Sequence, residues 1–168
     1  MRKLPKIITQ EEFEKIIKAE TNKEYRLAYL LGFEAGMRIS EILGLKGRIE
    51  PLTRDRVESA SIRILSGKGQ KDRIVPRPKR LNDTALNMLP LRIKRRALQY
   101  RIKKLGQQCI GKDITFHTLR HGFGSHLAGL GMPLHQIQML MGHSRLDTTG
   151  IYLHANPKET IEKAQELF

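Results

Sequence analysis

The chain has 168 residues, and its 31 lysines and arginines outnumber its 17 aspartates and glutamates, giving a formal net charge of +14. This length suits one domain with a real hydrophobic core, and so large a basic excess predicts a polyanionic partner, most simply nucleic acid. The single cysteine excludes an internal disulfide and a thiolate-rich metal site.

The first predicted helix begins at a capping box. Thr9-Gln10-Glu11-Glu12 has the spacing in which a threonine and a glutamate satisfy each other's backbone N–H groups. A helix that starts there carries three apolar residues on its inner face, Phe13, Ile16 and Ile17.

The second predicted helix runs from about Lys23 to Ala35, with Gly36 as its stop and an inner face of Leu27, Leu30, Leu31 and Phe33. Arg38 follows that stop and opens another short helix, 39–43. This position beside a turn is suited to an arginine that points at a ligand.

Two short alternating stretches predict a β-hairpin. Ile62 and Ile64 form the first strand and Ile74 and Val75 the second, with a glycine-rich turn between them. Lys68 is expected at or near the tip of that turn.

The segment 92–104 holds seven basic residues and no acidic one. Read as a helix, it places four cations on one side, namely Arg92, Arg95, Arg96 and Lys103, and four apolar residues inward, namely Leu91, Leu98, Ile102 and Leu105. In isolation such a stripe is more often a solvated face than a binding face.

Three more helices are predicted in the C-terminal third. Thr115 is a plausible cap for the first, with Gly129 and Gly131 as stops; Leu134 to Met141 follows, ended by Gly142; and a capping box at 156–159 opens the last. The expected fold is therefore one mainly α-helical domain with a small antiparallel β-sheet near Ile62 to Val75.

The candidate chemistry gathers in a window that contains all six histidines, from His117 to His154. His117 and Arg120 are three residues apart, so both lie on one side of a helix and can reach a single bound group. A guanidinium offers a planar fork that matches two phosphate oxygens, and Arg38 can supply a second fork.

Tyr152 is the candidate nucleophile. Its phenol has an ordinary pKa of about 10 and needs nearby cations or a base, which the arginines and His117 can supply. Lys68 is a compact acid able to protonate a departing sugar oxygen, and His143 is a further donor to the phosphate. This set describes phosphoryl transfer to tyrosine without a metal.

The chain resembles the catalytic domain of the tyrosine recombinases, the phage integrase and Xer-like family. The matching stretches run through most of the chain in the family's order: 36–43, Gly67-Lys68-Gly69 with Lys71-Asp72-Arg73, 117–121, 140–144 and 148–152.

The resemblance implies that Arg38 and Arg120 clamp the scissile phosphate, that Lys68 is the general acid, and that His117 assists proton transfer at the tyrosine. It implies that His143 completes phosphate binding and that Tyr152 forms a 3′-phosphotyrosyl link, releasing a 5′-hydroxyl. The family uses no metal or organic cofactor. With double-stranded DNA as the expected partner, we predict phosphate contacts from Arg92, Arg95, Arg96, Lys103, Lys71 and Arg73.

The family's assembly and domain plan give further expectations. Its members work as a tetramer on paired DNA sites, so we expect a homotetramer there and a monomer or weak oligomer without DNA. They usually carry a separate helical DNA-binding domain before the catalytic one. Because the first predicted helix starts close to Met1, we expect residues 1–168 to be a single catalytic domain without it, and the helix within 156–168 to dock on a neighbouring subunit.

Several other interpretations remain open. A type IB topoisomerase-like enzyme would relax DNA by the same cleavage chemistry, and 133–149 fits the helix-turn-helix of a plain DNA-binding regulator. His117 and His121 have the spacing of metal ligands, but no third ligand follows them. Taken singly, Arg38 fits a solvated arginine, Lys68 ordinary turn chemistry and Tyr152 a packing tyrosine.

The cellular setting follows from what the sequence lacks. It shows no secretory signal pattern and no uncharged apolar run of about 18 residues, so we expect a soluble cytoplasmic protein. An anionic membrane surface would want bulky apolar anchors such as Trp. The chain has no Trp and 5 Phe, which favours nucleic acid over a membrane.

Overall fold

The computed structural model describes residues 6–65, 72–142 and 157–168. The secondary structure is helical apart from one antiparallel hairpin, which confirms the predicted fold class. In chain order the elements are α1 Gln10–Ala19, α2 Lys23–Glu34, α3 Ile39–Leu43, the short 3-10 helix η1 Arg54–Arg56, β1 Ser61–Ile64, β2 Arg73–Pro76, α4 Asp83–Leu86, α5 Arg95–Ile110, α6 Phe116–Gly129, α7 Leu134–Met141 and α8 Pro157–Glu166.

The capping box of α1 is confirmed. The Thr9 hydroxyl accepts from the Glu12 backbone at 3.2 Å, and the Glu12 carboxylate accepts from the Thr9 backbone at 3.0 Å. These bonds satisfy N–H groups that have no partner inside the helix. The helix then presents its predicted inner face, Phe13, Ile16 and Ile17, to the core.

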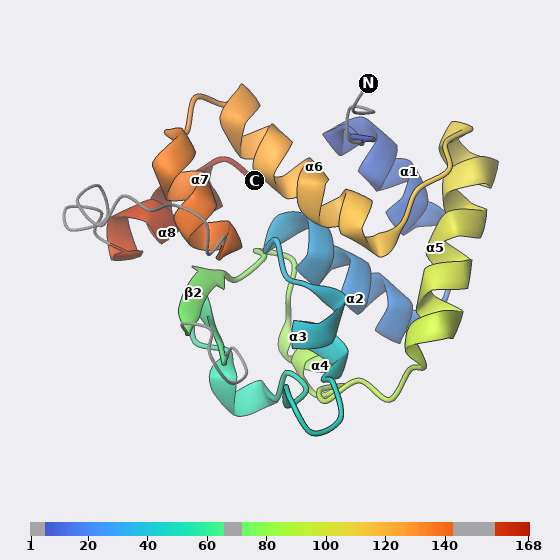
Figure 1. The fold of residues 1–168 in the computed structure, drawn as a ribbon, viewed down its shortest axis with the longest axis horizontal. Coiled ribbons are helices and arrows are strands. Elements are labelled where there is room, and N and C mark those ends of the chain that lie inside the picture. The colour runs from blue at the N-terminus through green and yellow to red at the C-terminus, as the bar shows by residue number, and fades with distance from the viewer. Residues whose placement is uncertain (1–5, 66–71, 143–156) are drawn as a thin grey trace.

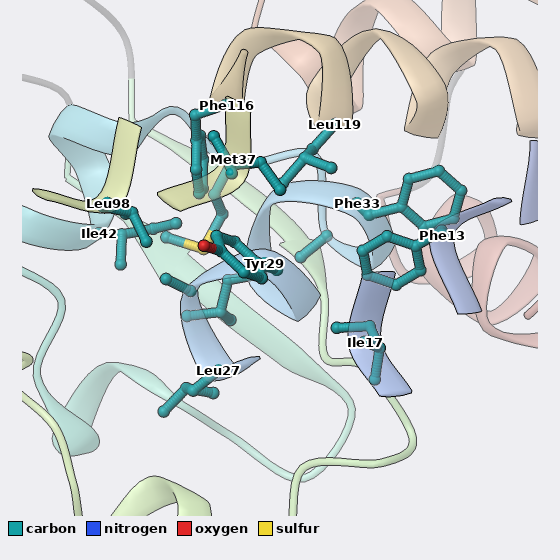
Figure 2. Packing of buried hydrophobic residues seen from close by; sticks show 14 of the residues in the cluster. Phe13, Ile17, Leu27, Tyr29, Phe33, Met37, Ile42, Leu98, Phe116 and Leu119 are labelled. Carbon is teal, nitrogen blue, oxygen red and sulfur yellow. The ribbon is translucent and has the colours of Figure 1, made fainter. Parts of the chain in front are cut away.

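Helix α2 lies at the centre of the molecule and packs against α1, α3, α4 and α6 (Figure 1). Its predicted inner residues are buried except Leu30, which is only partly buried. Tyr29, which was not predicted, is fully buried in the same core cluster as Met37 and Phe116 (Figure 2). The rings of Phe13 and Phe33 stack with centroids 4.1 Å apart, which fastens α1 to α2.

The hairpin pairs β1 with β2 in the register Ile62↔Val75 and Ile64↔Arg73. The two isoleucines of β1 and Val75 are buried, whereas Ile74 is exposed, as expected for a sheet with one face on the core. Helices α7 and α8 contact β2 (Figure 1). The predicted turn, with Lys68 and Lys71, falls within 66–71 and so lies outside the described residues.

Helix α5 begins at Arg95, so the prediction that Arg92 shares a helical face with the later cations is wrong. The Arg92 backbone N–H donates to the Glu24 carboxylate at 3.1 Å, a tertiary contact made by the non-helical segment before α5. The four apolar residues predicted to face inward are all buried: Leu91, Leu98, Ile102 and Leu105.

A second apolar cluster joins α6, α7 and α8. Phe168 stacks on Phe123 with ring centroids 5.9 Å apart, and the His126 ring hydrogen-bonds the Leu167 carbonyl at 3.1 Å. The end of the chain thus packs on its own domain, and docking on a neighbouring subunit stays a prediction. Within the described part of the chain, no helix is long and apolar enough to cross a membrane.

Candidate active site

A tight turn after α2 places Arg38. Gly36 has a left-handed φ of 63°, and a Cβ there would lie 2.5 Å from the Phe123 ring, so glycine suits both the turn and the packing. The fully buried Met37 anchors the segment through a hydrogen bond from its backbone N–H to the Leu31 carbonyl at 3.1 Å. Arg38 is therefore delivered to the start of α3, as predicted.

Helix α6 brings two more predicted residues to the same place. His117 and Arg120 line one pocket of about 180 Å³ together with Arg38, and its wall is completed by Met37, Ile39, Ser40, Gln99 and Phe116. Gln99 on α5 accepts a hydrogen bond from the Phe116 backbone at 3.2 Å, which joins α5 to the beginning of α6. The structure thus brings together three catalytic candidates from two distant stretches of chain.

Arg120 is almost fully enclosed, with 1% of its surface exposed. Its guanidinium donates to the Gly36 carbonyl at 2.5 Å and to the Met141 carbonyl, while its Nε has no hydrogen-bond partner among the described residues. A buried cation bound only to neutral carbonyls is poorly compensated. Such a group favours an anion in the adjoining pocket.

Glu41 links Arg38 to Arg73. Its side chain is 3% exposed and accepts from Arg38 Nη1 at 2.9 Å and from both terminal nitrogens of Arg73, at 2.5 and 2.9 Å. The Arg38 backbone N–H also donates to Glu41, at 2.6 Å. Glu41 was not predicted as a site residue, although its position three residues after Arg38 in a short helix is the capping-box spacing.

Three arginines also donate hydrogen bonds to backbone carbonyls at the C-terminal end of α7. Arg73 Nε donates to the Leu140 carbonyl at 2.8 Å, Arg120 to that of Met141, and Arg38 Nη2 to that of Gly142 at 3.1 Å. These consecutive carbonyls lie at the negative end of the helix dipole, where cations are favourable. His143 follows Gly142 in the sequence.

The electrostatics of the cluster are strongly positive. Burial, followed by the charges of Arg38 and Arg73, lowers the pKa of Arg120 to about 9, and Glu41 opposes only part of that shift. Burial alone would raise the pKa of Glu41, but Arg73 and then Arg38 hold it below its usual value. A guanidinium keeps its proton at neutral pH, so three cations here share one carboxylate.

The two histidines of the metal alternative lie side by side on α6. The rings of His117 and His121 meet edge to face with centroids 4.3 Å apart. Burial, then the charge of Arg120, lowers the pKa of His121. Among the described residues no cluster of three or more metal-ligating side chains occurs. The metal-free site stays a prediction.

The chain is similar in sequence to known proteins. The sequence profile of the Phage integrase family matches residues 86–159. The tyrosine recombinase XerA of Thermococcus kodakarensis is 37% identical over 185 residues, covering 98% of this chain and 63% of the relative. The chain belongs to the tyrosine recombinase family. It spans 63% of the length of that curated relative.

Two solved structures, an integrase and a recombinase, show the same fold. The integrase of mycobacterium phage Brujita matches with a TM-score of 0.77 at 22% identity, over all of this chain and 60% of the integrase. The XerH recombinase in a pre-cleavage complex with its difH substrate matches with a TM-score of 0.61 at 23% identity, over 84% of this chain and 48% of that one.

The remaining catalytic candidates of this tyrosine recombinase, Lys68, His143 and Tyr152, lie outside the described residues. Their roles, and those of Arg38, His117 and Arg120, stay predictions. The second helix of the alternative helix-turn-helix falls in the same undescribed stretch, 143–156.

The predicted DNA contacts occupy different environments. Arg92, Arg96 and Lys103 are exposed, with Lys103 Nζ 3.5 Å from Asp113, whereas Arg95 is partly buried and donates to the Gly44 carbonyl at 3.1 Å. The Arg73 side chain is only 7% exposed, with its guanidinium bound to Glu41 and to the Leu140 carbonyl. Its burial does not favour a DNA contact, which stays an untested prediction.

Proposed function

We propose that the chain is the catalytic part of a site-specific DNA recombinase that cleaves and rejoins strands through a 3′-phosphotyrosyl intermediate. The observation that carries this proposal is the shared pocket of Arg38, His117 and Arg120, whose lining, over the residues that the structure describes, holds two arginines, one of them buried, and no carboxylate. Such a pocket suits a phosphodiester, which carries one negative charge and two non-bridging oxygens.

In the proposed reaction, Arg38 and Arg120 bind the non-bridging oxygens of the scissile phosphate. The Tyr152 oxygen attacks phosphorus and passes its proton to His117, while the bond from phosphorus to the 5′ oxygen breaks and Lys68 protonates that oxygen. A 5′-hydroxyl then attacks the phosphotyrosine to rejoin a strand, so the bond energy is conserved. Each preorganised donor is typically worth about 3 kcal/mol in the transition state.

The donors of the pocket are already oriented before an anion arrives. Arg38 and Arg120 hydrogen-bond carbonyls of Gly36, Met141 and Gly142. A phosphodiester would exchange some of these bonds to neutral carbonyls for bonds in which donor and acceptor carry opposite charges, with a geometry that suits the arginine fork. This exchange supports a ligand that is an anion rather than a neutral molecule.

The proposed substrate is duplex DNA, held at paired sites by a homotetramer, and the proposed compartment is the cytoplasm. The exposed cations Arg92, Arg96 and Lys103 support backbone contacts. XerH, which shares the fold, binds its difH substrate in the pre-cleavage complex.

A trapping experiment tests the proposal. The chain is incubated with a library of nicked duplexes, randomised around the nick, from which the short cut piece escapes, with a chelator present. We expect a covalent protein–DNA adduct on a denaturing gel that is absent with Tyr152→Phe. Binding of the library without any adduct would overturn the proposal and favour a regulator.

The same reagents separate the two enzymatic interpretations. Duplexes recovered in the adduct are paired and assayed for strand exchange, and a supercoiled plasmid that carries one site is assayed for relaxation. Exchange between two sites supports the recombinase. Relaxation without exchange would replace it with the topoisomerase-like activity.

A further inference from the structure

We propose that Arg73 is a positioning residue that fixes both Arg38 and the end of α7, and so sets the geometry of the phosphate pocket. This inference rests on the proposed function, because the pocket is taken to bind the scissile phosphate. Arg73 does not line the pocket itself. It acts through the two groups that its guanidinium holds.

The guanidinium of Arg73 spans two elements from the beginning of β2. Its Nη1 and Nη2 grip the two carboxylate oxygens of Glu41 on α3 at 2.5 and 2.9 Å, and its Nε donates to the Leu140 carbonyl on α7 at 2.8 Å. All three nitrogens are therefore engaged, and the fork fixes the direction of each bond. A lysine has one nitrogen and cannot make this three-point connection.

Glu41 transmits this constraint to Arg38. Its carboxylate takes four hydrogen bonds, two from Arg73 and two from Arg38, through the backbone N–H and Nη1. A carboxylate has about four lone-pair sites, so this one is saturated and its rotation is fixed. Loss of Arg73 empties two sites, and the carboxylate and Arg38 are then free to turn together.

A close contact with Gly142 supplies the second constraint. A Cβ on Gly142 would lie 2.7 Å from Arg73 Cδ and 3.0 Å from its Nε, so the arginine runs along the bare backbone of this glycine. The Gly142 carbonyl in turn accepts from Arg38 Nη2 at 3.1 Å. Arg73 thus packs against the residue that directly precedes His143 in the sequence.

Loss of Arg73 should lower the cleavage rate by more than its effect on stability explains. Removal of one partner from a buried ion pair is destabilising in itself, because the remaining buried charge is less well compensated. That loss is shared by any arginine that pairs with a buried carboxylate, whereas a displacement of about 1 Å at a reacting group can lower a rate about 100-fold. The cleavage rate should therefore distinguish Arg73 from an arginine of another buried pair.

The test compares Arg73→Gln and Arg73→Lys with Arg80→Gln. The last variant is a matched control, because Arg80 also pairs with a buried carboxylate, that of Glu34, and does not line the pocket. Single-turnover adduct formation at saturating DNA, DNA affinity and Tm are measured for each. We expect adduct formation to fall about 100-fold in both Arg73 variants, with a change of less than about threefold in DNA affinity and in the rate of the control.

A combination with Arg38→Gln separates positioning from general damage. Because Arg73 is proposed to hold both Arg38 and the end of α7, adding Arg73→Gln to Arg38→Gln should lower the rate by clearly less than the loss of about 100-fold expected in the wild-type background, since one of the two positioned groups is already gone. If Arg73→Gln lowers the rate of adduct formation by the same factor in the Arg38→Gln background as in the wild type, the inference is overturned. An Arg73→Gln variant that cleaves at the wild-type rate or loses no more than the control would also overturn it.

A nitrogen spectrum of labelled arginine gives a readout that needs no cleavage. The Arg38 signal is assigned by its loss in Arg38→Lys. In the wild type this signal should show hindered rotation of the guanidinium. The guanidinium should rotate freely in Arg73→Gln but stay hindered in Arg80→Gln. An unchanged Arg38 signal in Arg73→Gln would overturn the inference. Absence of any wild-type adduct, with the spectral change present, would instead overturn the proposed function.

Discussion

Arg120 donates a hydrogen bond to the Met141 carbonyl, and Arg38 donates one to the carbonyl of the next residue, Gly142. Two arginines from α6 and the beginning of α3 therefore meet at the same helix end. Their convergence beside His117 is what turns separate sequence motifs into one pocket.

Replacement of Arg120 by lysine should impair chemistry strongly. The ammonium keeps the charge but cannot offer two parallel N–H groups to one phosphate. We expect single-turnover adduct formation to fall between about 100- and 1000-fold, as on loss of an oriented transition-state donor. Arg101→Lys is the matched control, because Arg101 pairs with the buried Glu20 and does not line the pocket. Equal losses in the two variants would argue for general destabilisation.

Phosphate-like anions should stabilise the folded protein. Inorganic phosphate that binds the Arg38–Arg120 pocket adds about 2.7 kcal/mol of stability at 100 times its dissociation constant. Tm is measured by calorimetry in phosphate against chloride at equal ionic strength. The Arg38→Gln variant corrects for the general effect of excluded salts. A phosphate-induced rise of the same size in that variant would contradict specific binding.

Gly142→Ala should lower the free energy of unfolding by more than the strain of a left-handed backbone at that residue explains. The residue has a φ of 62°, and its new Cβ would meet Arg73. Gly111 has a φ of 65° with nothing within 4 Å of an added Cβ, so Gly111→Ala carries only the backbone strain, of about 1–2 kcal/mol. Urea unfolding should show the larger loss for Gly142→Ala, and adduct formation should fall in that variant alone.

Acid should weaken the fold through His121. Its folded pKa lies below the ordinary value of 6.5, because burial and the charge of Arg120 disfavour the imidazolium. The unfolded chain binds the proton more readily, so stability is lost as the pH falls from about 6.5 towards the folded pKa. Urea unfolding between pH 7.5 and 5.5 should show a smaller loss for His121→Gln. An identical pH dependence in both proteins would contradict this assignment.

The exposed cations near α5 should set how strongly the affinity for DNA depends on salt concentration. Each phosphate contact that is removed lowers the slope of log affinity against log salt by about 1. We expect such a change for Arg96→Gln and Lys103→Gln, measured by anisotropy with labelled duplex DNA at several salt concentrations. Lys18→Gln, an exposed cation on α1, serves as the control. Equal slopes for all three variants would place the DNA elsewhere.

Local sequence patterns correctly predicted the features that depend on residues within a single helix. The capping box at Thr9, the glycine stop before Arg38 and the joint placement of His117 and Arg120 all follow from spacing along a single helix. The hairpin follows from alternation of apolar residues. These features depend on neighbours three or four residues apart, which a sequence displays directly.

The features that the sequence did not predict depend on contacts between residues far apart in the chain. Arg92 lies in the segment before α5, where its backbone N–H donates to Glu24, a contact that its own sequence pattern does not display. Glu41 and Arg73 are 32 residues apart, and no local period pairs them. Arg73 was predicted to contact DNA because of its charge alone. In the structure its guanidinium is enclosed between α3 and α7.

The central claim is that a tyrosine oxygen forms a covalent bond to DNA phosphate held by Arg38 and Arg120. The most direct measurement isolates the adduct formed by the wild-type chain with chelator present, digests it with protease and nuclease, and locates the nucleotide by mass spectrometry. We predict a nucleotide joined through its 3′ phosphate to Tyr152. A nucleotide on any other residue, or DNA cut with no protein attached, would contradict the account.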